Sequence, residues 1–229
     1  MLCVTALPAF AIVDFTPPVV TPNVSGTVGG DGWFTSDVAI SWTLDDPEST
    51  AAVLAGCEPV LLTTDTDGTT FFCSALSLGG ITTMTYTVRR DATAPVVTYV
   101  NAKAVYGIDE TISIFCNASD ALSGVASTTC QDITGSARSF LTTNTFSATA
   151  TDVAGNTGSA SITFTIEVSA SSLSGLIAAW VPKESLARNL QRRLERGDIV
   201  GFIRTVERES GKNIAPADAA ELIRLALLI

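Results

Sequence analysis

An internal repeat constrains this chain more than any other feature of its sequence. Residues 14–21 read DFTPPVVT and residues 91–98, 77 positions later, read DATAPVVT, with six of eight residues identical. Each copy ends on a segment in which apolar residues alternate with Thr, at residues 84–88 and 162–166. Alternation with a period of two is typical of strands that bury one face. The first two thirds of the chain therefore predict two similar β-domains in series.

The spacing of these strands favours sandwiches. Short alternating segments are separated by clusters of Gly, Asp, Asn and Pro, and a sandwich domain needs roughly 100 residues. We therefore expect a mainly β fold, with two tandem immunoglobulin-like β-sandwiches at residues 12–91 and 92–168.

The hydrophobic period changes after residue 168. Leu186, Leu190 and Leu194 follow a helical spacing, and Pro216 suits the first turn of a later helix. The charge changes at the same point: residues 1–168 hold 16 acidic and 4 basic side chains, whereas residues 169–229 hold 7 and 9. We expect a Ser-rich linker at residues 169–175 and a small α-helical bundle of three or four helices at residues 176–229.

Three motifs in the β part carry a family resemblance. These are the DxTxPxV opening of each repeat, the segment SDALSGV at residues 119–125 and the segment ATDVAGN at residues 150–156. Together they resemble bacterial extracellular immunoglobulin-like repeats, which are related to hyalin-repeat and fibronectin type III modules. The resemblance implies a stalk, spacer or adhesion role. The first repeat departs from it, because residues 76–80 read LSLGG where the second has the DxAGN turn.

The tail carries a second resemblance. Its segments LERGD (residues 194–198), FI (202–203), SGKNI (210–214) and DAAELI (218–223) are similar to the FIMAH-type helical domain of secreted bacterial proteins. This resemblance implies export and a modular architecture, and it carries no activity over to this chain.

Four cysteines fall within the two repeats. Cys57 and Cys73 belong to the first repeat, and Cys116 and Cys130 belong to the second. Zinc is the alternative use of such cysteines, but these are not in close pairs and the chain has no His. Domains that fold separately should not share a bridge, so we expect Cys57 to pair with Cys73 and Cys116 with Cys130.

The first eleven residues, MLCVTALPAFA, have an apolar run and a small-x-small site. They are interpreted as the remnant of a signal peptide, and a first edge strand is the alternative. Paired cysteines agree with an oxidising compartment. We expect a secreted or cell-surface protein without a membrane span, since no stretch reaches the ~20 apolar residues that a span needs.

Three aspartates are candidate ligands for calcium. Asp91 lies between the repeats, and Asp120 and Asp152 lie in the motifs of the second repeat, so all three are expected near domain ends. Calcium takes hard oxygen ligands and binds many extracellular modules weakly. The alternative is that these carboxylates cap turns through hydrogen bonds to main-chain amides. No other cofactor is expected.

Catalysis is not expected. The absence of His removes the Ser-His-Asp and Cys-His mechanisms, and there is no P-loop or GxGxxG motif. The acidic run DDPE at residues 45–48 is interpreted as a solvated turn. The acidic β part also argues against nucleic acid as a partner, because it would repel phosphates.

Two functions remain open at this level. The first is a secreted or cell-surface spacer or adhesion module, whose partner would be an extracellular protein or glycan. The second is the accessory C-terminal region of a larger secreted hydrolase that binds carbohydrate, with Trp33 and Trp42 as a sugar platform. Trp42 lies in an alternating segment, which favours a place in the core.

Overall fold

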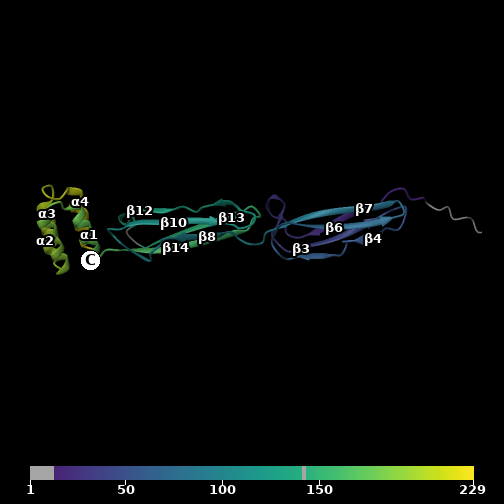
Figure 1. Ribbon diagram of the computed structural model, residues 1–229. Helices are drawn as coiled ribbons and strands as arrows, with labels where there is room; N and C mark the ends of the chain where they lie inside the picture. Colours follow the sequence, from purple (N-terminus) through teal and green to yellow (C-terminus); the bar gives the residue numbers. More distant parts are fainter. Residues whose placement is uncertain (1–12, 141–142) are drawn as a thin grey trace, which may run out of the picture. The chain divides into compact units, whose positions relative to one another are not determined.

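A computed structural model of the chain describes residues 13–140 and 143–229 (Figure 1). The described residues form two compact units. The first unit runs to Val96 and includes residues 119–128 and 150–158, and the second unit holds the rest. Residues 1–11, which the sequence suggested to be a signal remnant, lie outside the described residues.

Seven strands form the first repeat within these residues. They are β1 (Val19–Ser25), β2 (Trp33–Phe34), β3 (Val38–Asp45), β4 (Ala52–Ala55), β5 (Val60–Leu62), β6 (Thr66–Ser77) and β7 (Gly80–Arg90). One sheet has the order β1-β3-β5 and the other has the order β2-β7-β6-β4. The alternation in the sequence has the expected effect: Val38 and Ile40 of β3 are buried and Ala39 between them is exposed.

The second repeat has the same topology. Its described strands are β8 (Val96–Val100), β9 (Val105–Gly107), β10 (Thr111–Ser119), β11 (Val125–Thr128), β12 (Ile133–Ser136), β13 (Asn144–Asp152) and β14 (Thr157–Glu167). The sheets have the orders β12-β10-β8 and β11-β13-β14-β9, strand for strand the order of the first repeat. A short strand runs parallel to the last strand in both repeats, β2 to β7 and β9 to β14. The prediction of two tandem immunoglobulin-like sandwiches is confirmed.

Four helices follow the strands in the described chain. They are α1 (Ala170–Trp180), α2 (Glu184–Glu195), α3 (Ile199–Glu209) and α4 (Pro216–Ala226). Gly197 ends α2 with a φ of 68°, which glycine adopts without strain. Pro216 occupies the first turn of α4, where its missing amide hydrogen costs nothing. The predicted helical bundle is confirmed.

The linker predicted at residues 169–175 is wrong. Ser169 caps α1 in a reciprocal arrangement with Ser172, so the helix begins at Ala170. Leu173 is fully buried in a hydrophobic cluster that also contains Tyr106 and Phe164 of the strands. The Ser-rich composition that suggested a linker supplies the helix cap. The remaining domain boundaries stay predictions.

Candidate functional site: the segment between the repeats

The segment between the two repeats, residues 90–93, is held by charged side chains of the first repeat. The Arg90 guanidinium lies 2.5 Å from an Asp65 carboxylate oxygen and 2.8 Å from one of Asp37. Asp65 also accepts hydrogen bonds from the Ala92 amide (3.0 Å) and the Thr93 hydroxyl (2.5 Å). Burial alone would raise the pKa of Asp65, but these hydrogen bonds and the charge of Arg90 outweigh it and hold the pKa below its usual value.

Asp91, the central residue of this segment, is completely buried. Its amide donates to the Phe34 carbonyl at 2.9 Å. Its carboxylate accepts from the amides of Thr93 (3.1 Å) and Ser123 (3.0 Å). Every polar group of Asp91 thus has a partner, since its carbonyl accepts from Asn156.

Asn156 supplies the longest-range of these contacts. Its side-chain amide lies 2.9 Å from the Asp91 carbonyl oxygen, 3.3 Å from that of Thr93 and 2.8 Å from the Asp152 carboxylate. Asp152 in turn accepts from the amides of Gly155 (2.6 Å) and Asn156 (2.8 Å). The ATDVAGN motif therefore forms a turn whose last residue binds the segment between the repeats. The motif was visible in the sequence, but this contact of Asn156 was not.

The three aspartates proposed as calcium ligands lie together. One carboxylate oxygen from each of Asp91, Asp120 and Asp152 lies within 4.8 Å of the others. Asp91 and Asp152 are 0% and 2% exposed, and Asp120 is partly buried. Asp120 accepts from the amides of Leu122 (3.1 Å) and Gly124 (2.7 Å) through one oxygen. The arrangement fits both readings of the sequence, a cation site and a set of capped turns.

A glycine loop contacts the same turn. The Gly30 amide donates to the Ala154 carbonyl at 2.9 Å. A Cβ atom at Gly30 would lie 2.2 Å from the Val153 oxygen, and one at Gly29 would lie 2.0 Å from the Ala154 oxygen. These two positions accept only glycine without a movement of the main chain. Residues 29–32 read GGDG, a composition typical of turns, but nothing in the sequence indicates this close approach.

The first repeat has a related arrangement around Asp14, the counterpart of Asp91. Asp14 accepts from the hydroxyls of Ser49 (2.5 Å) and Ser77 (3.1 Å) and from the Gly79 amide (2.7 Å). These hydrogen bonds, first that from Ser49, lower the pKa of Asp14. Ser77 ends β6 as Asp152 ends β13. The first repeat therefore lacks a counterpart of Asp152 in the cluster of three aspartates.

Each repeat contains its own disulfide. Cys57 bonds to Cys73 and Cys116 bonds to Cys130, with Cα–Cα distances of 4.4 and 5.5 Å. Cys57 and Cys130 lie in equivalent loops, but Cys73 belongs to β6 of one sheet and Cys116 to β10 of the other. The two bridges are therefore local staples at different positions.

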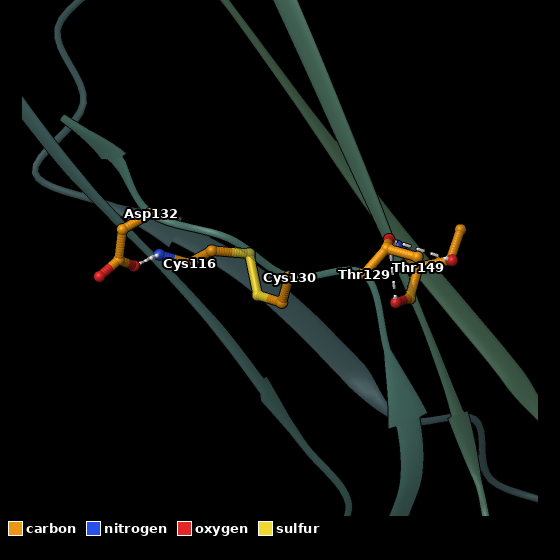
Figure 2. The surroundings of a disulfide bond; sticks show 5 residues. All are labelled: Cys116, Thr129, Cys130, Asp132 and Thr149. Carbon is orange, nitrogen blue, oxygen red and sulfur yellow. Dashed lines mark hydrogen bonds between the residues drawn. A yellow bond between two sulfur atoms is a disulfide. The ribbon is translucent and has the colours of Figure 1, made fainter. Parts of the chain in front are cut away.

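Figure 2 shows how the bridge of the second repeat is supported. The Cys116 amide donates to the Asp132 carboxylate at 2.9 Å. Beside Cys130, the Thr129 amide donates to the Thr149 carbonyl at 2.9 Å, and the Thr149 amide donates to the Thr129 hydroxyl at the same distance. The loop that carries Cys130 is thus fixed on both sides of the disulfide.

The suggested sugar platform does not form. Trp33 is 1% exposed, with the Arg89 guanidinium 4.1 Å from its ring centroid. Trp42 packs against the core of the first repeat, as its alternating segment indicated.

No family model matches the chain, and no curated protein matches it in sequence. Solved structures similar to it include the fibronectin(III)-like modules of Clostridium thermocellum CbhA, at 14% identity over 64% of this chain and 94% of that one (TM-score 0.28). A second is Sidekick-1 immunoglobulin domains 1–5, at 13% identity over 66% of this chain and 39% of that one (TM-score 0.38). A third is the protocadherin GammaB4 extracellular domain, at 13% identity over 67% of this chain and 32% of that one (TM-score 0.32). The alignments thus span about a third of the length of the last two chains. With TM-scores below 0.5, the assignment of the fold stands on this chain's own strand order. That order defines a protein of two tandem immunoglobulin-like β-sandwiches followed by a helical bundle.

Among the residues that the structure describes, no helix is long and apolar enough to cross a bilayer.

Proposed function

We propose that this chain is an exported, non-catalytic spacer or adhesion module of a bacterial surface or secreted protein. The observation that carries the proposal is the hydrogen-bonded segment between the repeats. A free linker would leave the main chain of residues 91–93 to solvent, but here Asp91 is buried and fully partnered. A connection of this kind suits a module that keeps its parts in a set arrangement.

Two further features support export. Each repeat has a disulfide of its own, and structural disulfides persist in oxidising compartments. Residues 1–168 carry a strong net negative charge. This charge repels other copies of the chain and anionic polymers, which favours solubility over nonspecific association. The proposal takes residues 1–11 as the remnant of a signal peptide and the four helices as a FIMAH-type domain.

The experiment has a binding arm and a turnover arm. The folded chain is applied to an array of extracellular glycans and matrix proteins, with the reduced, unfolded chain as the control. It is also incubated with glycoside, ester and peptide substrates. We expect no turnover above that of the heated protein, and any binding to be lost on unfolding. Turnover that follows the folded chain through purification would contradict a non-catalytic role.

Calcium binding at Asp91, Asp120 and Asp152 is a second proposal, favoured by the close approach of two buried carboxylates and a third that is partly buried. Carboxylates this close repel one another, and a divalent cation between them would remove the repulsion. Bound calcium would join Asp91, in the segment between the repeats, to the loop after β10 and to the end of β13 in the second repeat. This would stiffen the connection that the spacer role requires.

A further inference from the structure

The last turn of α2 carries an excess of positive charge around an open pocket of about 220 Å³. The pocket is lined by Asn189, Arg192, Arg193, Arg196 and Asp198. Three of these five side chains are guanidinium groups, and one is a carboxylate. The pocket is therefore cationic, although it belongs to a chain with a formal net charge of −10.

The carboxylate of this pocket is already engaged. Asp198 forms an ion pair with Arg193 and caps α3 by accepting from the Gly201 amide at 2.9 Å. Arg193 also donates to the Asn189 side-chain oxygen at 3.2 Å. Arg193 is thereby held in place at the wall of the pocket, while Asp198 has little capacity to neutralise a second arginine.

Arg192 and Arg196 have no acidic partner among the described residues. They lie four residues apart, Arg192 in the last turn of α2 and Arg196 as the capping residue directly after it, where like charges destabilise each other. Arg188, on the same face, is by contrast paired with Glu184 at 3.4 Å. The pocket thus brings two exposed, unpaired guanidinium groups next to a third that is already positioned.

The main chain beside the pocket is the carboxyl end of α2, where the helix dipole is negative. The main-chain oxygens of residues 192–194 accept hydrogen bonds from the amides of residues 196–198, so they are already paired. Attraction of an anion must therefore come from the arginine side chains.

We propose that this pocket binds a tetrahedral oxyanion, a phosphate or sulfate group, between Arg192 and Arg196. The planar guanidinium fork matches the oxygens of such groups and forms charge-assisted hydrogen bonds with them. The volume suits one such group. The site goes beyond the spacer role, because the helical bundle would bind anionic groups that the acidic repeats repel.

The experiment is an NMR titration of the full chain with potassium phosphate, with potassium chloride at matched ionic strength as the reference. We expect saturable shifts of the amide signals of residues 192–198 with phosphate and none with chloride. A second arm uses a sulfated heparin oligosaccharide, which shows whether the group is bound free or as an ester on a polymer.

Two double variants make the test specific. Arg192→Gln with Arg196→Gln should weaken binding at least about tenfold, because each lost charged hydrogen bond is worth about that factor. Arg204→Gln with Lys212→Gln removes the same charge from exposed positions outside the pocket and should leave binding within about twofold. Binding of neither probe, shifts that chloride reproduces, or equal losses in both variants would overturn the site.

Discussion

The side-chain amide of Asn156 lies 2.9 Å from the main-chain oxygen of Asp91, 65 positions earlier in the chain. Asp91 is buried, so its carbonyl would lose its partner without gaining water if the amide were removed. Asn156→Ala should therefore lower the free energy of unfolding by about 1–3 kcal/mol in urea denaturation. Asn23→Ala is the control, because its amide donates to Thr43 at an exposed site. The control should change the free energy of unfolding by less than about 0.5 kcal/mol. An equal loss in both variants would show that the hydrogen bond from Asn156 to Asp91 contributes no more than an exposed one.

The glycine loop gives a steric prediction. Gly30→Ala places a Cβ atom 2.2 Å from the Val153 oxygen, so the main chain must move. We expect a loss of about 1–3 kcal/mol in unfolding free energy. At Gly68 the nearest atom to an added Cβ is a Thr87 methyl carbon at 3.5 Å, an ordinary contact, so Gly68→Ala should be neutral or slightly stabilising. A fully stable Gly30→Ala protein would argue against the close approach.

Stability should depend on pH through Asp65. Its folded-state pKa is lowered, so the folded protein binds fewer protons there than the unfolded chain does. The resulting stabilisation is present above the unfolded pKa of about 3.9 and is lost as the pH falls through the folded pKa. The melting temperature should fall below about pH 4, and Asp65→Asn should make that fall shallower. Some slope should remain, because the pKa values of Asp14 and Asp46 are lowered as well. An identical slope in Asp65→Asn would contradict this role.

Calcium should raise stability if the aspartate cluster binds it. At about 10 mM calcium and a Kd of 0.1 to 1 mM, the gain is about 1.4–2.7 kcal/mol. Thermal melts with calcium and with EDTA measure it, and magnesium at equal concentration tests selectivity. Asp152→Asn should abolish the response, whereas Asp67→Asn, at an exposed carboxylate, should retain it. Identical melts in calcium and EDTA would leave these aspartates as turn caps alone.

The sequence was sufficient for the repeated topology because a period of two and the repeated DxTxPxV opening are local signals. Local pairing of Cys57 with Cys73 and of Cys116 with Cys130 also follows from assigning two cysteines to each repeat. Contacts between segments far apart in the chain could not be predicted from the sequence. The hydrogen bond from the Gly30 amide to the Ala154 carbonyl is an example. The start of α1 was missed because serine favours both linkers and helix caps, and only the partnership of Ser169 with Ser172 decides between them.

The most direct test of the spacer proposal is hydrogen exchange at the main-chain amides of Asp91, Ala92 and Thr93, measured by NMR. These amides donate to the Phe34 carbonyl and to the carboxylates of Asp65 and Asp91. We expect all three amides to exchange much more slowly than those of an unstructured peptide in the natural protein, and to exchange faster in Asn156→Ala, which loses the hydrogen bond to the Asp91 carbonyl. Exchange at the rate of an unstructured peptide in the natural protein, unchanged by the substitution, would contradict the account.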